Sequence, residues 1–429
     1  WRLPDGLSVA TGMAAKLACS GRYISGLDDG RIVEDLASYS GLNRRIELEY
    51  SNNRASARLL GMAPASATWR PDIGCSLDIG DLQTLDRLVA PRRAAGYTTS
   101  ALPWPRGDAT GDVEPAIQAV AESILQQDNA AGLETRALLM VRGGRIVAEA
   151  YADGFGAETP LLGWSMGKSV TAIMIGRMQH LGQLPADERA FEEGPLFPAW
   201  AGDDRRAIRL VDMLQMTSGL DWDETYAPGS DSTRILFQVA SASDVAMLST
   251  AAHRPGAHFH YSSGTTNLLA RFVHDRLGGA QAQLDFFAHE LLDPLGMRHT
   301  YFEPDPSGVF VGSSYIYATA RDWARVGLLM LNRGEFAGDT LLAPDWVDRA
   351  IAPNGSSNDP RYGYQFWLNA GGDALRWPAL PEDAYAMMGN RSQVVMVVPT
   401  ADTVLVRLGW SSGRYPMEEN FARLLADGR

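Results

Sequence analysis

Lysine is almost absent from this sequence. Only Lys16 and Lys168 occur among the 429 residues, although lysine and arginine together number 38, so 36 basic residues are arginines. Arginine keeps its charge in proteins, whereas a buried lysine gives up its proton at accessible cost. Chemistry that needs a neutral amine is therefore confined to two positions.

Long apolar runs and basic clusters are also missing. No stretch approaches the 18 or so consecutive apolar residues that cross a bilayer. The 51 acidic residues against 38 basic ones give a net charge of −13. An acidic chain without a basic run is poorly suited to bind nucleic acid or an anionic membrane surface. We therefore expect no membrane span and no nucleic-acid partner, and the oligomeric state stays open.

Cysteine is scarce as well. Cys19 and Cys75 are the only two, and neither belongs to a Cys-x-x-Cys pair or has zinc-type spacing. A disulfide between them and two buried free thiols are both compatible with the sequence. The chain starts at Trp1 rather than Met, and we expect an exported protein, periplasmic or secreted, with a cytoplasmic one as the alternative.

The chain divides into two parts by composition. Residues 1–108 form a mixed segment with scattered turn signals, which ends in a linker at 101–108 where two prolines and a glycine interrupt any regular element. Residues 109–429 form the larger part. We find no chemistry in the first segment that a motif identifies.

Strand-like runs occur near both ends of the larger part. Residues 137–141 and 146–151 flank Gly143-Gly144, and residues 393–398 and 403–408 form a second hairpin pattern, followed by a C-terminal helix. Mostly helical segments lie between them. The predicted fold class is α+β: one antiparallel sheet closed by early and late chain and flanked by helices, with a helical region inserted at about 185–320.

A serine and a lysine are three residues apart before an apolar helix pattern. Ser165 opens this pattern, and Lys168 follows one turn later on the same face. A helix N-terminus favours developing negative charge, and burial would lower the lysine pKa so that it could accept the serine proton. The alternative is an ordinary N-cap serine with a surface lysine.

The same residues fit a second motif. Gly163-x-Ser165-x-Gly167 matches the nucleophile elbow of α/β-hydrolases, which requires a preceding strand and a downstream histidine. Residues 158–162 make a poor strand, so this remains an alternative. The nearby histidine pair, His258 and His260, is more typical of a structural role than of a metal site, so we predict no metal.

Tyr261 is followed by small polar residues at the start of a helix pattern. This arrangement is compatible with a plain capping turn. It is also compatible with a phenol whose pKa is lowered by an adjacent ammonium, and which exchanges protons with the nucleophile and the leaving group.

A glycine marks the start of the late strand run. Gly389 permits close approach of the backbone to a ligand. The backbone amide of Gln393 could then act as the second oxyanion donor, opposite the amide of Ser165.

Taken in chain order, four motifs resemble those of the penicillin-recognising serine hydrolases, a superfamily that includes class C β-lactamases, D-alanyl-D-alanine peptidases, family VIII carboxylesterases and 6-aminohexanoate-dimer hydrolase. The motifs are Ser165-x-x-Lys168, residues 214–220, Tyr261-Ser262-Ser263 and residues 389–393. The resemblance covers about residues 110–429.

The resemblance implies an antiparallel sheet flanked by helices, an all-helical lobe, and a site between them. It implies Ser165 as nucleophile, Lys168 and Tyr261 sharing the proton transfers, and the amides of Ser165 and Gln393 as the oxyanion hole. It implies no metal and no organic cofactor.

Departures from the motifs bear on the substrate. Ser263 stands where lactamases and peptidases usually have asparagine, and Asn390-Arg391-Ser392 stands where they usually have Lys-Thr-Gly, although Arg391 could replace the missing cation. By its match to 6-aminohexanoate-dimer hydrolase, Tyr226 would hydrogen-bond the leaving nitrogen of an amide. We therefore expect a small-molecule ester or short linear amide as substrate, with a β-lactamase or D-alanyl-D-alanine peptidase as the alternative.

Overall fold

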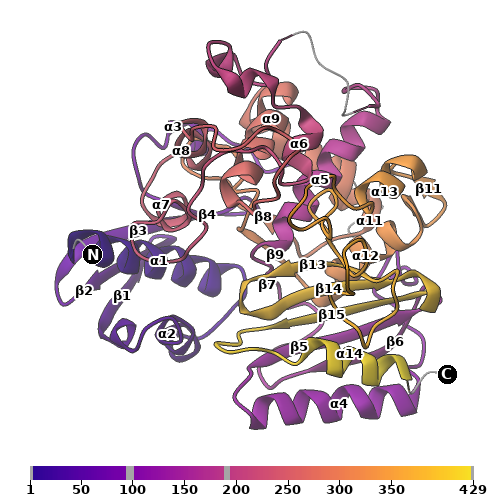
Figure 1. The fold of residues 1–429 in the computed structure, drawn as a ribbon. Helices are drawn as coiled ribbons and strands as arrows, with labels where there is room; N and C mark the ends of the chain where they lie inside the picture. The colour runs from indigo at the N-terminus through magenta and orange to yellow at the C-terminus, as the bar shows by residue number, and fades with distance from the viewer. Residues whose placement is uncertain (1–2, 93–100, 188–193, 427–429) are drawn as a thin grey trace.

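The computed structural model describes residues 3–92, 101–187 and 194–426. Parts of the sequence-predicted N-terminal segment and helical lobe, residues 93–100 and 188–193, lie outside the described residues. Figure 1 shows a sheet in the lower half of the molecule, helices above it, and the N-terminal segment at its side.

One six-stranded antiparallel sheet forms the centre of the larger part. Its strand order is β12-β13-β14-β15-β5-β6, so early strands pair with late ones as predicted. Both predicted hairpins are confirmed. The strands are β5 (Thr135–Arg142), β6 (Arg145–Tyr151), β12 (Trp367–Leu368), β13 (Tyr385–Gly389), β14 (Gln393–Val398) and β15 (Thr403–Gly409).

Helices cover both faces of this sheet (Figure 1). On one face, α4 (Pro115–Ala130) and α14 (Met417–Ala426) pack against strand residues such as Leu138. On the other, α5 (Met166–His180) and α12 (Ala320–Leu331) belong to the core that contains Leu139. Because neighbouring strand residues point to opposite faces and both faces are buried, the strands are continuous apolar runs.

Short helices make up most of the lobe above the sheet. They are η3 (Pro198–Trp200), η4 (Asp204–Ala207), α6 (Leu210–Leu214), α7 (Asp231–Phe237), α8 (Ala242–Met247), α9 (Ser263–Leu277), α10 (Ala280–Phe287), η5 (Ala288–Leu292) and α11 (Asp293–Leu295). A small sheet in the order β7-β9-β8 joins the lobe to the main sheet, with β7 (Leu161–Leu162), β8 (Tyr301–Phe302) and β9 (Ile316–Ala318). The remaining short elements are β10 (Glu335–Phe336), β11 (Asp339–Thr340), α13 (Pro344–Ala350), η6 (Asn390–Ser392) and η7 (Pro399–Ala401).

The N-terminal segment folds as a long helix against a four-stranded antiparallel sheet. The disulfide between Cys19 and Cys75 joins the helix to the last strand, which answers the question that the sequence left open. The elements are α1 (Leu3–Tyr23), α2 (Asp29–Ala37), η1 (Gly41–Arg45), β1 (Ile46–Ser51), β2 (Arg54–Leu59), β3 (Met62–Arg70), β4 (Gly74–Leu77) and α3 (Gln83–Asp86).

Buried polar contacts hold this segment against the rest of the chain. Lys16 of α1 pairs with Glu303 beyond β8, and both side chains are inaccessible to solvent. Glu303 also accepts hydrogen bonds from the Ser20 hydroxyl at 2.8 Å and the Cys75 backbone N–H at 2.6 Å. A buried charge pair needs such additional donors to offset its desolvation. The first of the two lysines is thus a structural residue.

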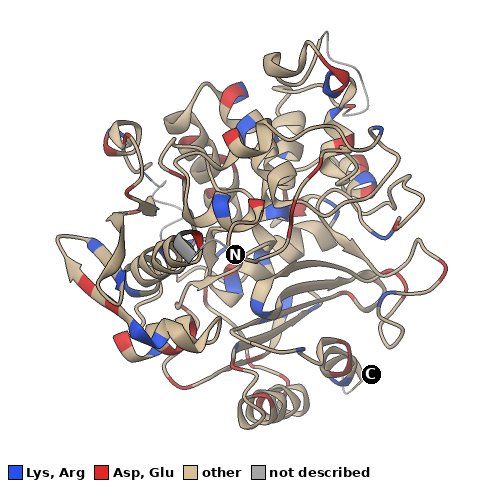
Figure 2. Cartoon of the chain, turned by 60° about the vertical axis from the view of Figure 1, so that its left-hand side comes forward, with Lys and Arg blue, Asp and Glu red and all other residues tan. Residues whose placement is uncertain are grey.

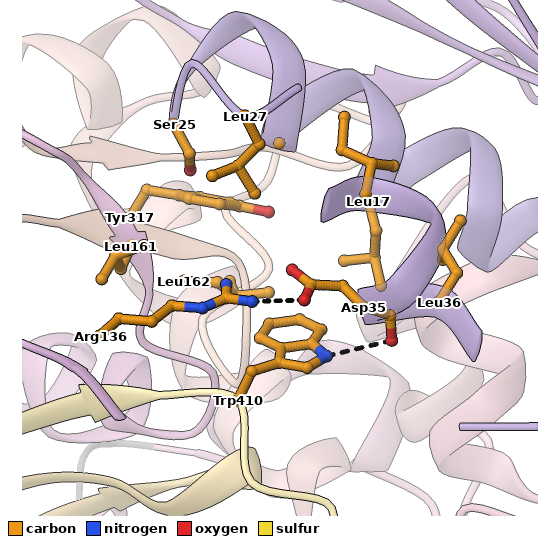
Figure 3. A pocket seen from close by; sticks show the side chains of 12 residues that line it. Leu17, Ser25, Leu27, Asp35, Leu36, Arg136, Leu161, Leu162, Tyr317 and Trp410 are labelled. Atoms are coloured by element: carbon orange, nitrogen blue, oxygen red, sulfur yellow. Dashed lines mark hydrogen bonds and ion pairs between the residues drawn. The ribbon is translucent and has the colours of Figure 1, made fainter. Parts of the chain in front are cut away.

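A second buried ion pair anchors α2. Figure 3 shows the Arg136 guanidinium of β5 directed at the Asp35 carboxylate, with the Trp410 indole beside them. The indole N–H of Trp410 donates to the Asp35 carbonyl oxygen at 3.1 Å and to the Ser38 hydroxyl at 3.1 Å. Burial raises the pKa of the Asp35 carboxyl, and the guanidinium offsets part of that shift. These contacts fix α2 beside the main sheet.

Charged residues of both signs are interspersed over the elements in Figure 2. None of the helices in the described parts of the chain is both long and apolar enough to cross a membrane.

Candidate active site

A strained turn carries Ser165 into α5. Trp164, directly before it, has φ 48°, a left-handed conformation that costs free energy for a residue with a side chain. Gly163 precedes it, and a Cβ there would lie 2.4 Å from the Trp323 ring, so only glycine fits. Ser165 then occupies the N-cap of α5, whose first turn brings Lys168 to the same face. The predicted buried helix is confirmed.

Lys168 is enclosed beside the Ser165 hydroxyl. Only 1% of Lys168 is exposed, and its Nζ lies 3.0 Å from Ser165 Oγ, 3.0 Å from Ser263 Oγ and 3.1 Å from the Ser313 carbonyl oxygen. Desolvation lowers the pKa of Lys168 to about 8, and the Glu224 charge opposes part of that shift. The neutral amine is therefore accessible near neutral pH.

Glu224 joins this network through Ser263. Its Oε1 accepts a hydrogen bond from Ser263 Oγ at 2.7 Å, and its Oε2 accepts from the Ser263 backbone N–H at 2.7 Å and from the Trp222 indole N–H at 2.8 Å. Sequence reasoning assigned no role to Glu224, because the contacts that distinguish it come from α9, almost 40 residues further along the chain. The one sequence signal was its place two residues before Tyr226.

Ser263 lies between Lys168 and Glu224. It stands where the related motif usually has an asparagine, and its part in substrate binding stays a prediction. The side chain is buried, accepts from Lys168 and donates to Glu224. Ser263 therefore connects a carboxylate to the amine and orients that amine.

Tyr261 lies close to Lys168, but its pKa differs from the sequence expectation. Lys168 Nζ is 4.9 Å from the centroid of the Tyr261 ring, so it faces the ring of the phenol. Burial raises the pKa of Tyr261 well above its usual value, the neighbouring Tyr362 and Glu224 add to the rise, and hydrogen bonding with the Ser165 side chain offsets only part of it. The predicted lowering of this pKa is wrong, because desolvation of the phenolate dominates. Tyr261 keeps its proton at neutral pH.

Tyr226 reaches the same hydroxyl from the loop before α7. Burial raises the pKa of Tyr226 above its usual value, and interaction with the side chains of Ser165 and Ser263 offsets part of that rise. Half of the residue surface is nevertheless exposed. The hydroxyl end thus lies inside the site while part of the ring remains accessible from outside.

The end of β13 approaches the turn that carries Ser165. A Cβ on Gly389 would lie 2.1 Å from the Gly163 carbonyl oxygen, so this contact requires glycine. Asn390 follows directly and lines one cavity together with Trp164. The Gln393 side chain is directed elsewhere: it donates to the Gly409 carbonyl and accepts from the Gly409 N–H. Its backbone amide as an oxyanion donor stays a prediction.

Arg391 is turned toward the N-terminal segment. Its guanidinium lies 3.7 Å from the centroid of the Tyr39 ring, and the residue is buried. It also donates to the Ser411 carbonyl at 3.4 Å. The guanidinium thus packs on Tyr39, and its predicted replacement of a carboxylate-binding lysine stays a prediction.

The α/β-hydrolase alternative is wrong. The main sheet is antiparallel throughout, and the strand before Ser165 is a two-residue strand of the small sheet. A nucleophile elbow needs a strand of a parallel sheet at that place. Of the histidines downstream of Ser165, which this alternative would need, His253 and His258 stack on each other, with ring centroids 4.3 Å apart.

Comparisons with known proteins agree with this fold. The family model described as Beta-lactamase matches residues 117–427. A 6-aminohexanoate-dimer hydrolase from Paenarthrobacter ureafaciens is 24% identical over 320 residues, which cover 71% of this chain and 80% of that protein.

Two solved structures show the same architecture. A Bacillus anthracis protein, proposed to be a 6-aminohexanoate-dimer hydrolase, superposes with a TM-score of 0.61 at 18% identity, covering 78% of this chain and 88% of its own. EstCE1, a hydrolase with promiscuous acyltransferase activity, superposes with a TM-score of 0.58 at 18% identity, covering 72% of this chain and 98% of EstCE1. The chain belongs to the Beta-lactamase family, and it is a hydrolase of the penicillin-recognising serine hydrolase superfamily.

Proposed function

We propose that this protein is a serine hydrolase that cleaves carboxylic esters or short linear amides through an acyl-enzyme on Ser165. The observation that carries the proposal is the buried amine of Lys168, with a pKa of about 8, 3.0 Å from the Ser165 hydroxyl. Such a pair supplies an activated nucleophile and its base in one turn of helix.

The contacts of Lys168 indicate how the amine would act as a base. A neutral amine has two N–H groups and one lone pair. Ser263 Oγ and the Ser313 carbonyl oxygen are acceptors within 3.1 Å, so the two N–H groups can be directed at them. The lone pair then faces Ser165 and can take its proton as Oγ attacks the substrate carbonyl carbon.

Collapse of the tetrahedral intermediate breaks the bond from the carbonyl carbon to the leaving oxygen or nitrogen. Tyr261 and Tyr226 keep their protons, because burial raises both pKa values, and each interacts with the Ser165 side chain. Either can therefore donate to the departing atom and be reprotonated from the Lys168 ammonium. A water then attacks the acyl-enzyme and gives up a proton to the neutral Lys168 amine. The bond from the acyl carbon to Ser165 Oγ breaks, and Oγ takes the proton back from Lys168. The products are a carboxylic acid and an alcohol or amine.

Negative charge develops on the carbonyl oxygen during both steps. The backbone N–H of Ser165 at the start of α5 can stabilise it. For the second donor we prefer the backbone N–H of Asn390 to that of Gln393. Gly389, next to Asn390, touches the turn that carries Ser165, and Asn390 itself borders the cavity beside Trp164.

The test is covalent labelling followed by turnover. A fluorophosphonate should add one equivalent to the native chain, as read by intact mass, and none to Ser165→Ala. Ser169→Ala is the matched control, since Ser169 lies in the same helix with its hydroxyl bonded to the Gln365 carbonyl. Labelling of Ser165→Ala at full stoichiometry would remove Ser165 from the mechanism. A panel of nitrophenyl esters, nitrocefin and a 6-aminohexanoate dimer then ranks esters, lactams and linear amides.

A further inference from the structure

A large cavity lies between the N-terminal segment and the hydrolase part. Its volume is about 560 Å³, within the range of about 300–1,000 Å³ that is typical of small-molecule sites. Most of its lining is apolar. The lining residues include Leu7 and Met13 of α1, Leu42 of η1, and Phe237 of α7, together with Trp164 and Tyr226.

The cavity is adjacent to the reacting hydroxyl. Trp164, which lines the cavity, directly precedes Ser165 in the chain, and Tyr226 lines it too and interacts with the Ser165 side chain. Asn390, at the end of β13, borders the same space. A molecule seated in the cavity would therefore have one end within reach of Ser165.

Charge is absent from the lining. Among the described residues that line the cavity, none is an aspartate, glutamate, lysine, arginine or histidine. A charged group placed there would lose its hydration without gaining an ionic partner, which is costly. The chemistry of the walls thus selects an uncharged, apolar group.

The wall on the N-terminal side is fixed in place. The Lys16–Glu303 pair holds α1, the Arg136–Asp35 pair holds α2, and Arg391 packs on Tyr39, which itself lines the cavity. The space is preformed, because buried ion pairs on both helices resist displacement of the wall.

We propose that this cavity binds the acyl chain of the substrate, and that the substrate carries an uncharged aliphatic or aromatic acyl group. The proposal rests on the proposed serine hydrolase function. The acyl group stays attached to Ser165 through both half-reactions, whereas the leaving group must exit between them. A space enclosed by two parts of the chain suits the group that stays. The N-terminal segment, which lies outside the matched family model, thereby determines specificity.

A cavity with no charged lining residue does not suit a 6-aminohexanoyl group. The acyl half of a 6-aminohexanoate dimer ends in an ammonium at neutral pH, and the cavity offers that group no carboxylate. An acyl chain of the same length without the amine meets walls that are mostly apolar and carry no charge.

The first experiment measures binding without turnover. Octanamide, a neutral acyl mimic, and 8-aminooctanamide, its cationic analogue, are titrated into Ser165→Ala by calorimetry. We expect octanamide to bind at least about tenfold more tightly, since each buried methylene adds affinity and a buried ammonium removes it. Equal affinities, or no binding of octanamide, would overturn the proposal whether or not the protein hydrolyses esters.

A matched pair of variants locates the binding. Leu42 lines the cavity and is 53% exposed, whereas Leu60 lies outside the lining and is 60% exposed, so each tolerates a polar replacement. In the Ser165→Ala background, Leu42→Asp should weaken the binding of octanamide by on the order of tenfold. It should also reduce the ratio between the affinities for octanamide and 8-aminooctanamide. Leu60→Asp should change neither the affinity for octanamide nor that ratio by more than about twofold. Equal effects of the two substitutions would show that the ligand binds elsewhere.

Turnover assigns the cavity to the acyl side. For nitrophenyl esters of the active protein, kcat/KM should rise by about 10- to 100-fold from acetate to hexanoate or octanoate, and Leu42→Asp should reduce that ratio. Ethyl and octyl acetate, which differ only in the alcohol, should differ by less than about threefold. A preference for the long alcohol with no acyl dependence would contradict the acyl assignment. If no ester is hydrolysed although octanamide binds as expected, the hydrolase function fails and the apolar site stands.

Discussion

Lys168 Nζ lies 3.0 Å from the hydroxyls of both Ser165 and Ser263, so one buried amine connects the nucleophile to the Glu224 carboxylate. The free energy that burial costs the ammonium brings the pKa of Lys168 from 10.5 to about 8. Charge on Glu224 keeps that pKa from falling further. If Lys168 is the base, as proposed, its protonation state governs activity around neutral pH.

The first prediction concerns pH. Because the base must be neutral, kcat/KM should fall tenfold per pH unit below the pKa of Lys168 and level off above it, with a midpoint near 8. The measurement is hydrolysis of a nitrophenyl ester from pH 5.5 to 9.5, read at the isosbestic wavelength of nitrophenol. A profile that stays flat between pH 6 and 9 would mean that Lys168 does not act as the base.

Lys168→Arg keeps a positive charge and removes the neutral form. Activity should fall by a factor on the order of 10³ or more, because guanidinium cannot accept the Ser165 proton. Lys16→Arg is the control, since it makes the same replacement at the other buried lysine, in the ion pair with Glu303. That variant should retain turnover per folded molecule. Similar losses in both would point to damaged folding and against a specific role for Lys168.

Glu224→Gln should move the acid limb of the pH profile. The Glu224 carboxylate raises the pKa of Lys168, so its removal lowers that pKa and shifts the midpoint to lower pH. The value of kcat/KM at high pH should drop by about tenfold, since an amide group cannot accept hydrogen bonds from all the donors that bind the carboxylate. Asp221→Asn removes an equal charge from an exposed neighbour and should leave the profile in place. A plateau loss without any shift would reduce Glu224 to a packing role.

Tyr226→Phe tests the difference between amides and esters. A nitrogen leaving group needs a proton more than nitrophenolate does, and Tyr226 interacts with the Ser165 side chain, beside which that nitrogen would depart. We expect kcat for a linear amide to fall by on the order of tenfold, while nitrophenyl ester turnover changes by less than about threefold. Equal losses on both substrates would show that Tyr226 does not act on the leaving group.

The main sheet and the Ser165–Lys168 pair could be predicted because their signals are local. Apolar runs bounded by Gly143-Gly144 indicate a hairpin on their own, and a spacing of three residues places two side chains on one helix face. The role of Glu224 could not be found this way, since it depends on Ser263 approaching from another helix.

Burial explains the wrong expectation for Tyr261. Its small polar neighbours in sequence were compatible with a capping turn or with a phenol whose pKa an adjacent ammonium lowers. In the fold, the Tyr261 ring stacks on Trp367 with centroids 5.1 Å apart and meets Tyr362 edge-on. Enclosure by rings from a distant segment raises the phenol pKa, and no local pattern contains that information. The N-terminal wall of the cavity could not be predicted for a related reason. Apolar residues such as Leu7 and Leu42 form no motif.

The last prediction concerns the contact that holds this wall. Glu303→Gln leaves the Lys16 ammonium buried without its counter-charge, and loss of one partner of a buried pair typically costs about 3–5 kcal/mol. The thermal unfolding midpoint should fall by several degrees. Glu34→Gln removes one partner of the exposed Arg44–Glu34 pair and should leave the midpoint unchanged. Because α1 forms one wall of the cavity, octanamide binding should weaken in Glu303→Gln and persist in Glu34→Gln. Equal midpoints in the two variants would mean that the Lys16–Glu303 contact does not stabilise the attachment of α1.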